Sequence, residues 1–337
     1  MLTSSHKDAR HSLCYINYLP IHLTPQMVLT MANILVTGGG RGIGRATALL
    51  AGARGWSVGI NYTRDASAAD RTVEDVQKAG GRAAKLKFDI TREADVVDMF
   101  SAHESYFGTL SGVVINAGIT AKSQPLAEFT TERLRNVIDT NVFGSYLCAR
   151  EASRRLAKSG KKNRSIVFVS SVASKLGSPN EYVDYAGSKG AIDSLTIGLA
   201  KELGPKGIRV NNVRPGIIKT DIHDLSGVPG RADKLGNMSP LGRPGEASEV
   251  GEAIIWLLSP QASYVTGAAI DVAGGSLTKS HGKASKGSSG GHTPMVVRED
   301  CTTGITPPIL AAVDFHTPIS FRSQSWVSCI DCVRRTD

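Results

Sequence analysis

The sequence predicts an α/β fold in which a doubly wound, seven-stranded parallel sheet forms a single domain. Short apolar runs alternate with segments of helical periodicity from Asn33 to Ser276, which is typical of parallel strands joined by crossover helices. A glycine-rich turn separates the first apolar run from the first helical segment. Polar residues follow several later runs, at the strand ends where this architecture binds ligands.

The elements of this sheet can be placed along one segment of the chain, residues 31–277. We expect strands near Ile34, Val58, Leu86, Val114, Val167, Val210 and Ile270. Residues 1–30 show no clear periodicity, so we expect a disordered extension or a start of the protein at Met27 or Met31. Residues 278–337 turn to Gly, Ser, His and Lys and then to a mixed tract, which predicts a disordered appendage.

The turn after the first strand has the composition of a phosphate-binding loop. Glycine permits positive φ angles and the close backbone approach that a diphosphate requires. The helix that follows directs unpaired amides and the positive end of its dipole at the phosphates. A glycine-rich loop can also be purely conformational, but the strand and helix around this one favour a dinucleotide site. The candidate residues are Thr37, Gly38, Gly40, Arg41, Gly42, Ile43 and Gly44.

The end of the second strand indicates which cofactor the site prefers. Enzymes that prefer NAD usually place a carboxylate there, against the ribose hydroxyls. Here the strand carries Asn61 and is followed by Arg64, and Asp65 comes one position later. The guanidinium groups of Arg41 and Arg64 suit a ribose phosphate, although both could be ordinary solvated arginines. We therefore expect NADP(H) to be preferred, with NAD(H) possible.

A tyrosine and a lysine further along the chain are candidate catalytic residues. Tyr185 and Lys189 are four positions apart, so they share one helix face. An ammonium group near a phenol lowers its pKa from the ordinary value of ~10. Such a pair is common by chance, but two polar residues add weight to it. Ser171 ends a buried apolar run, with Ser170 as the fallback, and Asn141 lies inside a helical pattern from Phe129 to Ala157.

In this order, these residues resemble the short-chain dehydrogenase/reductase family over about Asn33 to Ser276. The turn from Thr37 to Gly44 matches the TGxxxGIG motif of that family. Its catalytic tetrad is matched by Asn141, Ser171, Tyr185 and Lys189. Further cofactor contacts are matched by Asp89 and Ile90, by Asn116, Ala117 and Gly118 of the NAG motif, and by Pro215, Gly216, Ile218 and Thr220 of the PGxxxT segment. The branch that looks most similar is that of bacterial sugar dehydrogenase-like and 3-oxoacyl-carrier-protein reductase-like proteins.

The resemblance implies a Rossmann-type fold and an NADP(H)-dependent reduction of a carbonyl to a secondary alcohol. Tyr185 would act as acid and base, and Ser171 would hold the substrate oxygen. Lys189 would lower the pKa of Tyr185 and bind the nicotinamide ribose, and Asn141 would hold a water molecule. Two departures stand out: Ile115 replaces an Asn, and the interval from serine to tyrosine is one residue longer than usual. We expect the additional residue in the loop 177–181.

The substrate is less well defined by the sequence. The segment from Lys219 to Gly245 is polar and rich in Gly and Pro, which suits a lid and a small polar carbonyl or sugar substrate. A basic run from Arg150 to Arg164 leaves open a 3-oxoacyl-carrier-protein reductase that docks an acyl carrier protein, although a solvated helix end explains it too. A non-catalytic NADPH-binding regulator is the alternative from another class. Relatives imply a homotetramer or a homodimer.

Composition excludes several other classes of function. The formal charge of +9 is spread along the chain and no motif for nucleic acid accompanies it. No apolar run is long enough to span a bilayer. Cys148 is the only cysteine of the core, which fits a cytoplasmic protein without disulfides. Cys329 and Cys332 have metal-ligand spacing but no second pair, so we expect no metal site.

Overall fold

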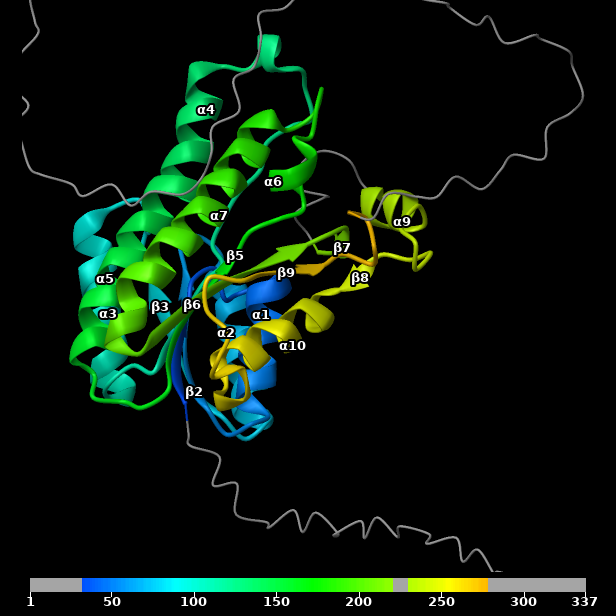
Figure 1. Cartoon of the computed structure of the whole chain (residues 1–337). Coiled ribbons are helices and arrows are strands. Elements are labelled where there is room, and N and C mark those ends of the chain that lie inside the picture. The colour runs from blue at the N-terminus through cyan, green and yellow to red at the C-terminus, as the bar shows by residue number, and fades with distance from the viewer. Residues whose placement is uncertain (1–31, 221–229, 278–337) are drawn as a thin grey trace, which may run out of the picture. The chain divides into compact units, whose positions relative to one another are not determined.

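The computed structural model describes residues 32–220 and 230–277, which form a parallel sheet between two layers of helices (Figure 1). The sheet has seven strands in the order β3-β2-β1-β4-β5-β6-β9, all parallel, so the predicted fold class is confirmed. The strands are β1 (Asn33–Val36), β2 (Ser57–Tyr62), β3 (Arg82–Lys87), β4 (Gly112–Ile115), β5 (Arg164–Val169), β6 (Ile208–Pro215) and β9 (Ala269–Val272). Each of the predicted strands lies where the apolar runs placed it.

The helices cover both faces of the sheet (Figure 1). One layer contains α1 (Gly42–Gly52), α2 (Ala66–Lys78) and α10 (Ala247–Leu258). The other contains α3 (Glu93–Phe107), α4 (Thr131–Ile138), α5 (Gly144–Lys158) and α7 (Val183–Leu203). Short elements complete the described chain: α6 (Ala173–Leu176), α9 (Arg231–Gly236), a strand pair of β7 (Ile218–Lys219) and β8 (Gly245–Glu246), and single turns at Leu126–Glu128, Gly204–Lys206 and Pro260–Ala262.

Alternate residues of each central strand bury their side chains in opposite layers. In β5, Ile166 and Phe168 pack with α3, α5 and α7, whereas Val167 and Val169 pack with α1, α2 and α10. A strand buried on both faces reads as a continuous apolar run rather than an alternating one. This explains why the central strands could be predicted from short apolar runs.

The order of the strands defines where a ligand crevice can form. The chain proceeds from β1 outward to β2 and β3, and then returns to β4 on the other side of β1. In doubly wound sheets the ligand binds outside the carboxyl ends of the strands at such a reversal. Here Thr37 follows β1 and donates its backbone N–H to Val114 of β4 over 2.9 Å. The glycine-rich turn therefore lies at the reversal.

The long helical pattern predicted from Phe129 to Ala157 is a helix with an inserted wide turn. It begins at Thr131, where the Thr130 hydroxyl accepts the Arg133 N–H over 3.1 Å, and it ends at Lys158. Between α4 and α5, residues Asp139–Phe143 form a π-helical turn that contains Asn141. Such turns are often found at functional sites.

Some predictions lie outside the described residues. These are the extension 1–30, the appendage 278–337 with Cys329 and Cys332, and the middle of the predicted lid, residues 221–229. Among the residues that are described, none belongs to a helix long and apolar enough to cross a membrane.

Candidate active site

The glycine-rich turn adopts the backbone conformation that its composition predicts. Gly38 and Gly42 have φ angles of 62° and 54°, in the region that disfavours side chains. At Gly44 a Cβ atom would lie 2.4 Å from the Gly38 carbonyl oxygen, so a side chain there is excluded by the backbone itself. Helix α1 begins at Gly42, so the last glycines of the turn belong to its first turn, whose amides have no partners within the helix. The turn therefore fits a diphosphate.

Three predicted cofactor residues hold this turn through their side chains. The Thr37 hydroxyl accepts the N–H groups of Asn116 and Ala117 at 3.0 Å each. The Asn116 amide donates to the carbonyls of Thr37 and Gly38 at 2.9 and 3.1 Å. Asn61 accepts the Gly38 N–H at 3.3 Å and donates to the end of β3. Thr37 and Asn61 are 0% and 1% exposed, so the hydrogen bonds that their side chains make are buried beneath the turn.

A cleft of about 620 Å³ opens beside the turn and contains several basic residues. Arg41 is exposed and lines it, as predicted for a phosphate contact, and Arg71 lines it as well. Arg64 is exposed after β2 but is not part of this lining. The Asp65 carboxylate accepts the Ala68 N–H over 2.9 Å, so one of its oxygens caps α2. Arg71 was missed because an arginine on a helix surface gives no distinctive sequence signal.

The remaining predicted cofactor residues lie beside the cleft, in the core, or at the carboxyl ends of the strands. Thr220 lines the cleft, and a Cβ atom on Gly42 would lie 3.4 Å from its methyl group. Gly216 packs so closely on the end of β9 that a Cβ atom would lie 2.8 Å from Ala273. In contrast, Ile90 and Ile218 are both 4% exposed, and their side chains belong to the two core clusters. Asp89, Ala117, Gly118 and Pro215 stand at the carboxyl ends of the strands or just beyond them.

Tyr185 lies in the first turn of α7, and Lys189 lies one helical turn further along. The Lys189 ammonium donates to the Val169 carbonyl at the end of β5 over 2.8 Å and lies 5.5 Å from the centroid of the Tyr185 ring. Burial raises the pKa of the Tyr185 phenol, while the hydrogen bond with Ser171 lowers it. Burial also lowers the pKa of Lys189 to about 8, against the opposite influence of Asp193.

The prediction that Lys189 lowers the pKa of Tyr185 is therefore wrong for this structure. Burial disfavours the charged form of each group and is the largest influence on both pKa values. The ammonium is directed to a carbonyl of β5 rather than to the phenol oxygen. A phenol with a raised pKa keeps its proton at neutral pH, which suits a proton donor.

The structure distinguishes between the two candidate serines. The Ser171 side chain forms a hydrogen bond with Tyr185, and its hydroxyl also accepts the Ala173 N–H over 3.1 Å. Ser170 is buried and donates to the Lys189 carbonyl over 3.2 Å. Ser171 is thus brought to the phenol in spite of the longer interval. Within that interval, Ser178 and Asn180 have positive φ angles of 45° and 61°, so the loop 177–181 makes a tight turn.

Asn141, a predicted catalytic residue, is buried, and both atoms of its side-chain amide form hydrogen bonds. Its amide oxygen accepts the Ile119 N–H over 2.8 Å. Its amide nitrogen donates to the Ile119 carbonyl over 2.8 Å and to the Ser188 hydroxyl over 3.0 Å. A Cβ atom on Gly118 would lie 3.3 Å from both the Asn141 oxygen and the Lys189 nitrogen. The glycine of the NAG motif thus leaves room between these two polar groups.

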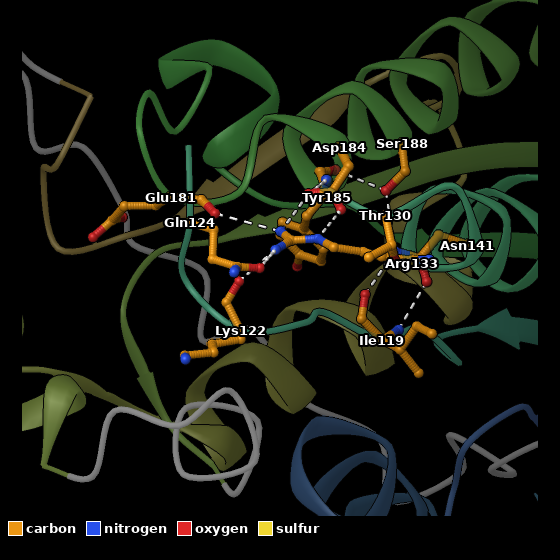
Figure 2. A network of polar contacts seen from close by, with 10 residues as sticks. All are labelled: Ile119, Lys122, Gln124, Thr130, Arg133, Asn141, Glu181, Asp184, Tyr185 and Ser188. Atoms are coloured by element: carbon orange, nitrogen blue, oxygen red, sulfur yellow. Dashed lines mark hydrogen bonds and ion pairs between the residues drawn. The ribbon is translucent and has the colours of Figure 1, made fainter. Parts of the chain in front are cut away.

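An additional polar network around Tyr185 was not predicted (Figure 2). It includes the buried side chains of Arg133 in α4 and of Asp184 and Ser188 in α7. A signal for it exists in the sequence, since Arg133 stands four positions before the apolar Val137 and therefore on the same helix face. Charged residues on an apolar helix face are buried only when they are paired.

Three arginines of the basic run at the end of α5 are paired with neighbouring carboxylates. Arg155 pairs with Glu104 at 2.5 Å and with Glu151 at 2.7 Å, and Arg150 pairs with Glu93. These contacts favour the interpretation of the run as an ordinary helix surface. Within the described residues, no cluster of three or more His, Cys, Asp or Glu is placed to hold a metal ion. Cys148 is a buried free thiol whose pKa is raised by burial to about 12.

Comparison with known proteins places these features in a family. A family model described as "Enoyl-(Acyl carrier protein) reductase" matches residues 38–276. The uncharacterized oxidoreductase YgfF of Escherichia coli is 52% identical over 246 residues, which are 73% of this chain and 100% of that protein. Glucose 1-dehydrogenase 2 of Bacillus subtilis is 36% identical over 248 residues, covering 73% of this chain and 95% of that protein.

A solved structure shows the same architecture. The 3-ketoacyl-(acyl-carrier-protein) reductase of Brucella melitensis, crystallised with NADH, superposes with a TM-score of 0.67 at 33% identity, covering 73% of this chain and 98% of that one. The region that the family model matches contains the glycines of the turn from Gly38 to Gly44, the six strands from β2 to β9 of the main sheet, and all four predicted catalytic residues. The chain therefore belongs to the short-chain dehydrogenase/reductase family of oxidoreductases.

Proposed function

We propose that the protein is an NADP(H)-dependent oxidoreductase that acts on CH–OH groups and reversibly reduces a carbonyl to a secondary alcohol. One observation carries this proposal: the Ser171 hydroxyl is hydrogen-bonded to the Tyr185 phenol, and the Lys189 ammonium lies 5.5 Å from its ring. A phenol that holds its proton and a hydroxyl beside it can together bind one carbonyl oxygen. The polar segment after Thr220 favours a small polar carbonyl or sugar as substrate.

The residues of the glycine-rich turn would hold the cofactor, and a nicotinamide group supplies a hydride when it is bound. The backbone from Gly38 to Gly44 and the first amides of α1 would take the diphosphate. Arg41 would contact the ribose phosphate that distinguishes NADP from NAD. Arg64, which follows the end of β2 in the sequence, is the second candidate for this contact. Asp65 is already engaged in capping α2, which supports a preference for NADP(H).

Each of the four predicted catalytic residues would have a separate role in the reaction. Tyr185 would donate its proton to the carbonyl oxygen as the alcohol forms, and Ser171 would hold that oxygen by a hydrogen bond. Lys189 would place a positive charge 5.5 Å from the centre of the phenol ring and bind the cofactor ribose. Asn141 would hold the backbone of Ile119 against the π-helical turn, and so fix the position of these two segments.

We further propose a homotetramer or homodimer in the cytoplasm. Exposed apolar side chains support an assembly through the helices α4 and α5, because Ile138, Phe143 and Tyr146 are 43%, 52% and 46% exposed there. Apolar groups gathered on a surface commonly mark an interface between proteins.

The test is the oxidation of NADPH and of NADH, followed by absorbance, with a panel of diketones, aldehydes, ketoses and acetoacetyl thioesters. Glucose with NADP is assayed in the reverse direction. We expect a lower KM for NADPH than for NADH, and a loss of kcat on the order of 100-fold or more in Tyr185→Phe. Tight NADPH binding without turnover of any substrate would instead support a cofactor-binding regulator.

A second candidate is a 3-oxoacyl-carrier-protein reductase, because a solved reductase with that description superposes on this chain. The ion pairs of Arg150 and Arg155 reduce the charge available for docking a carrier protein. The discriminating comparison is acetoacetyl-carrier protein against the same acyl group on a small thiol. A strong preference for the carrier-bound form, lost on reversing the charge of the exposed Lys158, Lys161 and Lys162, would favour this candidate.

A further inference from the structure

A buried ion pair connects α4 to the helix that carries Tyr185 (Figure 2). The Arg133 Nε atom lies 2.8 Å from the Asp184 Oδ2 atom, and Nη2 lies 3.1 Å from Oδ1. The two side chains are 8% and 1% exposed. Removing two charges from water is costly, so a buried pair of this kind is weak evidence for stability alone. Its position suggests another reason for its presence.

The remaining donors of the same guanidinium hold two loops together. Arg133 Nη1 donates to the Lys122 carbonyl at 2.5 Å and to the Gln124 amide oxygen at 3.1 Å, and Nη2 donates to the Glu181 carbonyl at 3.4 Å. The Gln124 N–H also donates to the Glu181 carbonyl at 3.2 Å. The guanidinium carbon lies 3.4 Å from the centroid of the Phe129 ring. One side chain thus joins the segment after β4 to the loop before α7.

Asp184 extends this connection to the backbone of Tyr185. Its Oδ1 atom accepts the Tyr185 N–H over 2.8 Å, in the first turn of α7 where a carboxylate is favoured by the helix dipole. On the other side, the Ser188 hydroxyl donates to the Tyr185 carbonyl over 2.7 Å and accepts the Asn141 amide over 3.0 Å. Both polar groups of the Tyr185 backbone are therefore held by side chains whose partners lie in other elements (Figure 2).

We propose that Arg133 and Asp184 are positioning residues whose ion pair fixes the Tyr185 phenol relative to the substrate. The proposal rests on the function proposed above for Tyr185. Proton transfer requires the phenol within hydrogen-bonding distance of the carbonyl oxygen. A misplacement of about 1 Å can cost on the order of 100-fold in rate. The pair also joins Lys122 and Gln124, in the segment after β4, to Glu181 in the loop before α7.

The test compares Asp184→Asn, Arg133→Met and the double variant with wild type. Asp184→Asn is nearly isosteric and keeps an oxygen for the Tyr185 N–H, but it removes the charge. We expect kcat to fall on the order of 100-fold in each single variant and no further in the double variant, since both changes break one unit. The KM for NADPH should stay near that of wild type, because neither residue lines the cleft beside the glycine-rich turn.

Arg155→Met is the matched control. Arg155 also forms short ion pairs with two carboxylates, but it joins α5 to α3 away from Tyr185. The Arg155→Met substitution should lower the melting temperature and leave kcat unchanged. An equal loss of kcat in the control, or an unchanged kcat in folded Asp184→Asn, would overturn the proposal. If Arg133→Met does not fold, the Asp184→Asn result decides.

Hydrogen exchange of residues 178–189 supplies a readout that does not depend on turnover. We expect faster exchange there in Arg133→Met and Asp184→Asn, with wild-type exchange in Arg155→Met. Unchanged exchange in all variants would contradict the positioning role. If wild type reduces no carbonyl on the panel, the proposed function fails, and the exchange data still report on whether the pair holds the first turn of α7.

Discussion

At the scale of single residues, burial is the strongest influence on the chemistry of this site. Tyr185 and Lys189 both have pKa values shifted towards the neutral form, and desolvation is the largest cause in each case. A sequence shows that a phenol and an ammonium are one helical turn apart, but it does not show how much water reaches them. The spacing correctly predicted that the two side chains lie close together on α7, but it did not predict that the pKa of Tyr185 is raised.

The raised pKa of Tyr185 leads to a prediction for the two directions of the reaction. Reduction needs the protonated phenol, so its kcat/KM should stay flat across neutral pH and decline only in alkaline solution. Oxidation of the alcohol needs the phenolate, so its kcat/KM should still be rising at alkaline pH. Initial rates in both directions over a range of pH test this. A rate of reduction that already declines through neutral pH would show that the working pKa is lowered.

The predicted cofactor residues show which structural features a motif can predict and which it cannot. The sequence correctly predicted the turn from Gly38 to Gly44, because its φ angles and close contacts require glycine. It did not distinguish Arg41, which lines the cleft, from Thr37 and Asn61, whose buried side chains form hydrogen bonds with the backbone around the turn. That distinction depends on which way a side chain points, and a linear motif does not contain this information.

At the scale of secondary-structure elements, the close approach of α3 to β2 depends on one histidine. The His103 Nε2 atom lies 2.6 Å from the Asn33 Oδ1 atom, and its Nδ1 atom is buried without a partner. A Cβ atom on Gly59 would lie 2.2 Å from that Nδ1 atom, so the ring fills the space that the glycine leaves. Burial lowers the pKa of His103 from 6.5 to about 3.

This environment predicts a loss of stability in acid that His103→Gln should reduce. The folded-state pKa lies below the unfolded value, so the unfolded chain takes up the proton first. The contribution of His103 is present above pH 6.5 and is lost as the pH falls towards 3. Between pH 7 and 5 we expect wild type to lose about 2 kcal/mol from this cause, and the glutamine variant to lose none of it. Urea unfolding of both proteins at the two pH values measures the difference, and parallel losses would refute the assignment.

Elements that depend on periodicity were predicted well, and short irregular elements were not. The strands β1, β4 and β5 are buried on both faces, and their apolar runs identified them. The strands β7 and β8 have two residues each, which is too short for any pattern. The π-helical turn at Asp139–Phe143 also escaped prediction, because one additional residue in a helical turn leaves the apolar spacing of α4 and α5 nearly unchanged.

At the scale of the whole molecule, the described residues contain a complete sheet with both of its helical layers. The first strand begins at Asn33 and the last ends at Val272, and both core clusters lie between them. The relative from Escherichia coli is matched over its full length by 73% of this chain. The parts needed for the fold and for the proposed chemistry are therefore present within residues 31–277.

We accordingly predict that a chain of residues 31–277 keeps the fold, the assembly and the activity of the full chain. The buried contacts of the sheet lie within this range, so the melting temperature should change little and kcat should remain near that of the full chain. Size-exclusion chromatography, thermal unfolding and NADPH oxidation on the best substrate of the panel compare the two proteins. Removing residues 1–30 and residues 278–337 separately serves as the internal control, because it assigns any defect to one end. Dissociation of the shortened protein, or loss of its turnover, would show that the end removed contributes contacts to the assembly or to the site.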